Sequence, residues 1–269
     1  MKIFLKKNKL IKCIQNEKDL GFVPTMGAIH EGHISLFKRS IQECKKTIVT
    51  IFVNKPQFNK KADYKNYPRN TINDIKKIRQ TKVDYLYLPT AKQIYPNGKN
   101  RKVKIIPFSK KLCGKYRPGH FEAVVDVIDR FTNLIRPKKI YLGNKDMQQL
   151  IILENFIKKK FKKIKVVGCK TIREKNGLAI SSRNLLLTKK QKKIASLVYR
   201  LILKNKKKLI KKFSIAVEIK NKINKLGITN LEYLRKININ KINNSSKSKK
   251  NYKIFVAYYL GKTRLIDNI

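Results

Sequence analysis

The sequence predicts an α/β protein: a Rossmann-like parallel sheet with helices on both faces, followed by a smaller α+β domain at the C-terminal end. Two observations predict this class. As far as Lys170, short runs of β-branched and aromatic residues alternate with stretches of helical periodicity, an order typical of parallel strands joined by right-handed crossovers. Beyond that point the alternation weakens, and a lysine-rich helical stretch precedes apolar, strand-like segments.

The first three strands are expected between residues 20 and 89. The run "LGFVPTMGAIH" is apolar and ends in a Pro/Gly turn, which indicates a short buried strand. From Glu31 to Lys45, apolar side chains recur at helical spacing. "TIVTIFVN" is typical of a strand buried on both faces. "NTINDIKKIRQTK" and "VDYLYLP" then repeat the pattern of helix and strand.

Two further helix-and-strand pairs follow. "HFEAVVDVIDRFTNLIRP" predicts a helix that Pro137 ends, and "KKIYLGNKD" predicts a strand and a turn. "MQQLIILENFIKKKF" and "KIKVVGCK" predict another helix and strand. We place the domain boundary near Thr171, giving a Rossmann-like domain at residues 1–171 and an α+β domain at 172–269. The second domain carries "IREKNGLAISSRN", a lysine-rich helix and the strand "YKIFVAYYL".

Composition narrows the class of protein. Apolar residues form 42% of the chain, which indicates a folded globular protein. No apolar run approaches the roughly 20 residues that span a bilayer, and the first residues lack the apolar core of a signal peptide. We therefore expect a cytoplasmic protein without a membrane partner. The four cysteines are scattered without a CxxC pair, which favours reduced thiols over disulfides or zinc.

The charge raises a second hypothesis. Lys and Arg number 66 against 16 Asp and Glu, a formal net charge of +50, which is typical of nucleic-acid-binding proteins. However, the lysines occur in nearly every segment, and no RNP motif, zinc-finger spacing or basic zipper accompanies them. We expect no specific nucleic-acid partner, nonspecific binding at low salt, and attraction of anionic substrates toward any cleft.

The stretch "PTMGAIHEGH" holds two of the three histidines of the chain. His30 and His33 are three residues apart at the expected start of a helix, so both rings can face the same way. A helix N-terminus suits a phosphate, and two imidazoles there can stabilise charge that grows as a phosphate bond breaks. Zinc ligation is less favoured, because two residues rather than three separate the histidines. Ordinary packing of each histidine is the remaining alternative.

A second motif, "GLAISSRN", supplies Ser181, Ser182 and Arg183. Two hydroxyls and a guanidinium on a loop suit closure over a polyphosphate, because arginine makes bidentate contacts. Taken alone, such a run is more often a helix cap or a turn. The turns "FVNKPQF" and "LGNKD" follow predicted strands, so we expect them to converge at the carboxyl edge of the sheet, where ligands bind.

Together these motifs resemble the HIGH/KMSKS-type nucleotidyltransferase superfamily. Within it, "PTMGAIHEGH", "FVNKPQF", "YPR", "RPGHF", "LGNKDMQQL", "REKNGLAISSRN" and "GKTRLIDN" occur in the order of the pantothenate synthetase (pantoate–β-alanine ligase) family. The resemblance implies an enzyme of pantothenate and coenzyme A biosynthesis that condenses (R)-pantoate with β-alanine. It further implies ATP as co-substrate with Mg²⁺, a pantoyl-adenylate intermediate, release of AMP and pyrophosphate, and a homodimer.

The resemblance implies a role for each matching residue. The catalytic set is His30, His33, Lys145, Ser181, Ser182 and Arg183. The ATP-binding set is Met26, His33, Gly143, Lys145, Asp146, Ile172, Ser181, Ser182 and Arg183. The pantoate- and β-alanine-binding set is Met26, Asn54, Gln57 and Gln149, and Asp74 is the candidate metal ligand. The first domain would thus bind nucleotide and pantoate, while the second carries the SSRN loop.

The chain departs from the family's motifs at several positions. Asn144 replaces the acid of "GEKD", Cys113 stands for the glutamate of "LEG", and Glu122 replaces the arginine of "RGV". These changes predict a slower or less stable enzyme. Arg117 and His120 either contact a ligand or hold a turn. Two other functions stay open: a different HIGH-type enzyme such as a cytidylyltransferase, and a basic nucleic-acid-binding protein.

Overall fold

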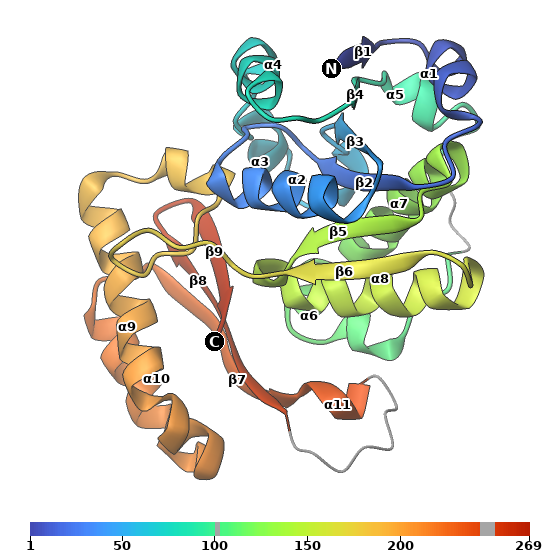
Figure 1. Cartoon of the computed structure of the whole chain (residues 1–269). Helices are drawn as coiled ribbons and strands as arrows, with labels where there is room; N and C mark the ends of the chain where they lie inside the picture. The colour runs from blue at the N-terminus through green and yellow to red at the C-terminus, as the bar shows by residue number, and fades with distance from the viewer. Residues whose placement is uncertain (100–102, 243–250) are drawn as a thin grey trace. The chain divides into compact units, whose positions relative to one another are not determined.

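A computed structural model describes residues 1–99, 103–242 and 251–269 (Figure 1). The chain divides into two compact units, which are described separately. The first consists of Met1–Asn144 and Gln148–Lys170, and the second of Lys145–Met147 and Thr171–Ile269. Across the described ranges, no helix combines the length and the apolar character needed to cross a bilayer.

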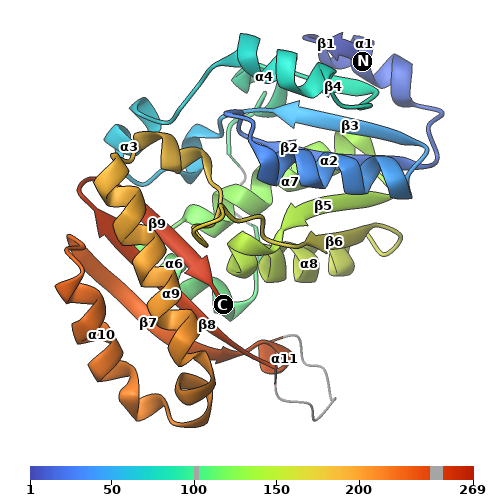
Figure 2. The same cartoon turned by 60° about the vertical axis from the view of Figure 1, so that its left-hand side comes forward.

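The first unit is built on a six-stranded parallel sheet in the order β1-β4-β3-β2-β5-β6, with helices on both faces (Figure 2). In the middle of the sheet, Phe22 pairs with Ile48 on one side and Ile140 on the other, and all three are fully buried. The strands are β1 Lys2–Phe4, β2 Leu20–Thr25, β3 Lys46–Ile51, β4 Tyr85–Tyr87, β5 Lys139–Gly143 and β6 Lys165–Cys169.

The helices of this part of the chain follow the apolar stripes of the sequence. In the longest, fully or nearly buried side chains such as Val124, Ile128 and Phe131 recur at helical spacing and face the sheet. It ends at Ile135, just before Pro137, as expected. The helices are α1 Lys7–Ile14, α2 Glu31–Glu43, α3 Lys61–Lys65, α4 Thr71–Arg79, α5 Ala91–Ile94, α6 Cys113–Tyr116, α7 His120–Ile135 and α8 Met147–Lys160. Short 3₁₀ turns lie at η1 Lys55–Gln57, η2 Pro107–Lys110 and η3 Asn144–Asp146.

Helix α2 approaches strand β2 closely at Gly21. A Cβ atom on residue 21 would lie 2.1 Å from Ser40 Oγ and 3.2 Å from Cys44 Sγ. Ser40 is buried and its hydroxyl hydrogen bonds to Thr47 Oγ1 at 2.8 Å, so turning it away breaks a buried contact. Gly21→Ala is therefore expected to lower the free energy of unfolding by about 1–3 kcal/mol, measured by urea denaturation. In Gly143→Ala, the control, the new Cβ meets no described atom within 4 Å, and an equal loss there would contradict this explanation.

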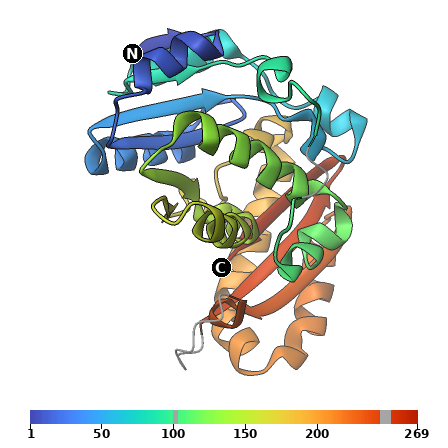
Figure 3. The same cartoon turned by 90° about the vertical axis from the view of Figure 1, so that its right-hand side faces the viewer.

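The second unit is a three-stranded antiparallel sheet, β7-β8-β9, covered on one face by two helices (Figure 3). Its core joins Val198 and Ile202 of the first helix to Leu234, Ile254 and Val256 of the sheet. The elements are η4 Ser182–Leu186, α9 Lys189–Lys211, η5 Phe213–Ile215, α10 Ala216–Lys225, β7 Asn230–Asn238, α11 Ile239–Ile242, β8 Tyr252–Leu260 and β9 Thr263–Asn268.

The predicted fold class is confirmed: a parallel sheet flanked by helices and a small α+β part with its own antiparallel sheet. Helix α9 begins as the sequence dictates, with a capping box in which Thr188 and Gln191 each accept the other's backbone N–H. Several elements were not predicted individually, among them β1 and α1 at the start of the chain, the short helices α3, α5, α6 and α11, and α10 and β7 in the second unit.

Candidate functional site

Within the first unit, the order of the strands places a switch point between β2 and β5. The chain runs from β2 outward through β3 and β4, and later continues from β5 to β6 on the other side. In open parallel sheets, ligands bind at such a point, at the carboxyl ends of the strands. Met26 directly follows β2, and Gly143 is the last residue of β5. Two residues of the predicted ATP-binding set therefore lie at this edge.

The histidine pair stands at the start of α2, directly after this edge. His30 is the N-cap residue of the helix and His33 lies in its first turn. Their imidazole rings stack with centroids 4.0 Å apart and planes inclined by 18°. The two side chains therefore lie side by side, beside the positive end of the helix dipole. This arrangement suits hydrogen bonding by both rings to one anionic group.

The turn that leads to the histidines has an unusual backbone. Gly27 has a φ of 80° and Ala28 a φ of 51°, and an alanine in this region carries strain. Asp74, buried in α4, holds the turn: its Oδ2 accepts the Ala28 N–H at 2.8 Å and its Oδ1 the Ile29 N–H at 2.7 Å.

These contacts bear on the prediction that Asp74 binds a metal ion. Both oxygens of the Asp74 carboxylate already accept a backbone N–H. Among the residues that the structure describes, no group of three or more His, Cys, Asp or Glu side chains can hold a metal ion. The assignment of Asp74 as a metal ligand remains a prediction.

A hydrogen-bonded network after β3 brings three of the predicted pantoate residues together. Gln57 Nε2 donates to Met26 Sδ at 3.0 Å, and Asn54 Nδ2 donates to Gln57 Oε1 at 3.1 Å. The Tyr95 hydroxyl donates to Asn54 Oδ1 at 2.8 Å. Burial raises the pKa of Tyr95 above its usual range, so this hydroxyl keeps its proton and fixes which way the Asn54 amide points. Gln149, the fourth residue, lies half-buried on α8.

Arg117 and His120 support the same turn. His120 Nδ1 lies 2.8 Å from the Gln57 carbonyl oxygen, and Arg117 Nη1 lies 3.1 Å from His120 Nε2. A carbonyl only accepts and a guanidinium only donates, so His120 is neutral and carries its proton on Nδ1. Arg117 Nη2 donates to the same carbonyl at 3.1 Å. These contacts favour a role in holding the turn, which was one of the two alternatives from the sequence.

In the second unit, the SSRN segment forms η4. Ser181 is the N-cap, and its Oγ accepts the Arg183 N–H at 3.3 Å. Ser182 is buried, whereas Ser181 and Arg183 are half-buried. Asn184 Nδ2 donates to the Ala179 carbonyl at 3.0 Å, which ties η4 to the preceding turn. The capping role that the sequence left open is therefore present for Ser181.

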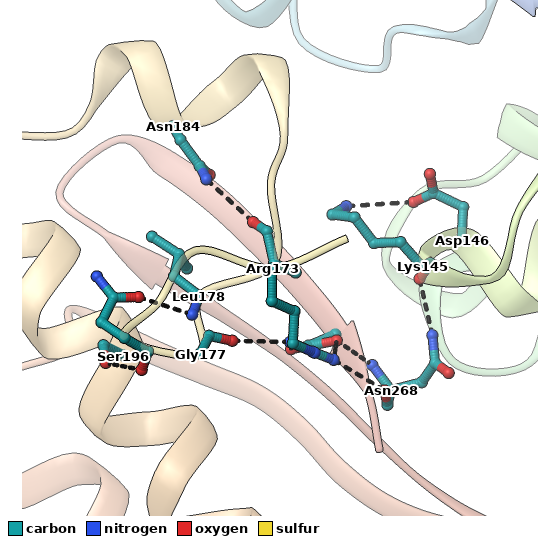
Figure 4. Close-up of polar contacts among 11 residues, drawn as sticks. Lys145, Asp146, Arg173, Gly177, Leu178, Asn184, Ser196 and Asn268 are labelled. Atoms are coloured by element: carbon teal, nitrogen blue, oxygen red, sulfur yellow. Dashed lines mark hydrogen bonds and ion pairs between the residues drawn. The ribbon is translucent and has the colours of Figure 1, made fainter. Parts of the chain in front are cut away.

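A partly buried ion pair organises the segment before η4 (Figure 4). Arg173 Nη1 and Nη2 lie 2.6 and 2.8 Å from the two carboxylate oxygens of Asp267. The guanidinium also stands 4.0 Å above the centre of the Tyr199 ring, and its Nη1 donates to the Gly177 carbonyl at 3.1 Å. The sequence motifs contain both charged residues, but no role was assigned to either.

Lys145 and Asp146 also belong to the second unit, and Asn268 of β9, the residue after Asp267, hydrogen bonds to the backbone of Lys145. Asn268 Nδ2 donates to the Lys145 carbonyl at 2.8 Å (Figure 4). Lys145 Nζ lies 3.4 Å from Asp146 Oδ1, a loose contact that leaves the ammonium other donors for a ligand. Ile172, the predicted adenine contact, is half-buried and its carbonyl accepts the Ile180 N–H at 3.0 Å.

Comparison with known proteins gives consistent results. A family model described as "Pantoate-beta-alanine ligase" matches residues 2–269. The chain is 36% identical to the pantothenate synthetase of Thermodesulfovibrio yellowstonii over 257 residues (94% of this chain, 91% of the relative). It is 39% identical to that of Francisella tularensis subsp. mediasiatica over 263 residues (97% and 92%).

Solved structures are similar over the same length. The pantothenate synthetase of Thermus thermophilus has a TM-score of 0.89 at 30% identity, covering 100% of this chain and 99% of that one. The pantoate-beta-alanine ligase of Francisella tularensis, complexed with beta-gamma ATP and beta-alanine, has a TM-score of 0.83 at 35% identity (100% and 97%).

Proposed function

Because the chain belongs to the pantoate–β-alanine ligase family, it is a ligase of pantothenate biosynthesis, and we propose that it works through a pantoyl-adenylate intermediate. The observation that carries the proposal is the stacked pair His30–His33, which follows the switch point of the sheet in a chain that matches the family from residue 2 to 269. The ATP and β-alanine in the solved relative from Francisella tularensis support these two ligands as substrates.

The chemistry requires activation of a carboxylate. A carboxylate oxygen of (R)-pantoate attacks the α-phosphorus of ATP, a C(O)–O–P bond forms, and the bond from the α-phosphorus to pyrophosphate breaks. The ammonium of β-alanine then loses one proton, and the resulting amine attacks the acyl carbon. The C–N bond forms, the bond from the acyl carbon to the AMP oxygen breaks, and a second proton leaves the nitrogen to give the amide. Both steps depend chiefly on position, and orientation of the reactants contributes roughly 7–11 kcal/mol in well-placed systems.

We propose that His30 and His33 donate hydrogen bonds to the ATP phosphates. Negative charge moves onto the leaving pyrophosphate as its bond breaks, and donors aimed at that charge stabilise the transition state more than the ground state. The 4.0 Å separation of the rings supports this role, because two imidazoles that lie side by side can reach the same polyphosphate.

For pantoate, we propose contacts with Gln57, Asn54, Gln149 and Met26. The Gln57 amide is already oriented by Asn54 and Met26, and sulfur is a weak acceptor, so the amide protons remain available to a substrate hydroxyl or carboxylate. A side chain that is fixed before the substrate binds loses less entropy on binding.

For ATP, we propose contacts with Gly143, Lys145, Asp146, Ile172 and the segment Ser181–Arg183. Lys145 and Arg183 would neutralise the polyphosphate, Asp146 would bind the ribose, and the backbone beside Ile172 would bind adenine. The motif match supports these roles, and Mg²⁺, a homodimer and a cytoplasmic location are proposed on the same resemblance. Mg²⁺ is usually held by substrate phosphates and water with one or two carboxylates, so it would enter with ATP.

The test is exchange of labelled pyrophosphate into ATP. The protein is expected to catalyse exchange that requires pantoate and Mg²⁺ but not β-alanine, because the first half-reaction alone is reversible. Adding β-alanine should then give pantothenate and AMP in equal amounts. Absence of pantoate-dependent exchange, or formation of a nucleotide-diphosphate conjugate from CTP, would contradict the proposal and favour a cytidylyltransferase.

A further inference from the structure

Two oppositely charged side chains of helix α4 hydrogen bond to the turn that precedes the histidine pair. Asp74 and Lys77 are three residues apart and therefore lie on one face of the helix. Asp74 accepts the N–H groups of Ala28 and Ile29, and Lys77 Nζ donates to the Ile29 carbonyl at 2.7 Å. Both peptide groups of Ile29, the residue before His30, are thus hydrogen bonded to the same helix face.

These contacts require a buried carboxylate and a strained backbone, both of which cost free energy, and this indicates that they have a functional role. The Asp74 side chain is only 2% exposed, and a buried carboxylate is tolerated when charge-assisted hydrogen bonds replace its water. A Cβ atom on Gly27 would lie 2.8 Å from Asp74 Oδ2, so the carboxylate also occupies the space where a side chain would stand. Ala28 is held at a φ of 51°, a conformation that the surrounding contacts must stabilise.

We propose that Asp74 and Lys77 are positioning residues for the histidine pair: they hold the Gly27–Ile29 turn and thereby fix where His30 and His33 present their rings. The turn is joined directly to the N-cap of α2, so any rotation of the Ile29 peptides displaces both imidazoles together. The catalytic consequence rests on the proposed function, because a displacement of about 1 Å can cost on the order of 100-fold in rate.

Lys77→Met is the sharpest variant. It keeps most of the apolar stem of the side chain, removes the donor to Ile29, and leaves the candidate metal ligand intact. Lys76→Met, an exposed neighbour on the same helix, is the matched control. We expect kcat for pyrophosphate exchange to fall about tenfold in Lys77→Met with a smaller change in the KM for ATP, and the control to stay within twofold of the wild type.

Histidine NMR reports the positions of the rings independently of activity. The chain has three histidines, so ¹³C-labelling of the imidazole Cε1 position gives three signals in metal-free buffer. We expect the signals of His30 and His33 to shift in Lys77→Met while that of His120 stays in place. A general loss of stability would lower the melting temperature without this selective shift.

Asp74→Asn provides a second measurement. The amide retains one acceptor but places an NH₂ group against a backbone N–H, so we expect a larger shift of the same two signals and a fall in kcat of about 100-fold. The proposal is overturned if both variants keep the wild-type signals of His30 and His33, or if the signals shift and kcat stays within twofold. If the wild type itself shows no exchange, the proposed function fails, and the NMR spectra still decide whether Asp74 and Lys77 position the pair.

Discussion

Replacing His33 with alanine is expected to slow the pantoate-dependent exchange of pyrophosphate into ATP by about 10²- to 10³-fold, the usual cost of removing one donor from a developing negative charge. The imidazole stands in the first turn of α2 and stacks on His30 at 4.0 Å. Because the interaction strengthens as the phosphate bond breaks, the loss should fall on kcat more than on the KM for ATP.

The fold should survive this substitution. His33 is half-buried in the first turn of a helix, and alanine has the highest helix propensity. The melting temperature is therefore expected to stay near that of the wild type, and Lys38→Ala, at an exposed position of the same helix, is the control for activity. Exchange at a near-normal rate in His33→Ala would refute the assigned role, whereas unfolding of the variant would show that the ring is structural.

The parallel sheet was predictable because its strands carry a strong signal. Segments such as residues 46–51 and 139–143 are short, apolar and bounded by turns, and their central residues are buried on both faces of the sheet. The elements that were not predicted lack this contrast. Strand β1 has three residues, and α1 buries only Leu10 and Ile14 among lysines and polar residues. Strand β7 has only two buried side chains.

The candidate site was predictable where its residues lie close together in the sequence. The spacing of His30 and His33 is enough to place both rings on one side of a helix, and the motif after β3 is enough to group Asn54 with Gln57. The supporting contacts were not predictable. Asp74 lies 46 positions from Ala28, and Arg173 lies 94 positions from Asp267. Only the folded sheet and helices bring such partners together, and a lone Asp in a lysine-rich helix gives no sign of its acceptor role.

Arg173→Met is expected to lower the free energy of unfolding of the second unit by about 2–4 kcal/mol, because breaking a buried ion pair costs about 3–5 kcal/mol and this pair is partly buried. The side chains of Arg173 and Asp267 are 19% and 11% exposed, and they share two short hydrogen bonds. Without the guanidinium, the partly buried Asp267 carboxylate stands unpaired next to an apolar side chain. Urea denaturation followed by tyrosine fluorescence measures the loss, since the chain has 12 tyrosines and no tryptophan.

The same substitution should also affect activity under the proposed function. Asp267 Oδ1 accepts the Asn268 N–H at 2.8 Å, and Asn268 in turn holds the Lys145 carbonyl. Loss of the ion pair therefore loosens both the Gly177 turn and the peptide of Lys145. Arg200→Met is the control: its exposed guanidinium donates one hydrogen bond, to the Asn176 carbonyl at 3.1 Å, so its loss should cost less than about 1.5 kcal/mol.

A double variant distinguishes the cost of the unpaired Asp267 carboxylate from the cost of the lost packing of the Arg173 guanidinium. If most of the destabilisation comes from the unpaired carboxylate, then Arg173→Met combined with Asp267→Leu should recover much of the stability, because well-packed apolar residues often replace a buried ion pair at little cost. If it comes from the stacking of the guanidinium on Tyr199, the double variant should be no more stable than Arg173→Met. An Arg173→Met variant as stable as the wild type would mean that the pair contributes nothing to the fold of the second unit.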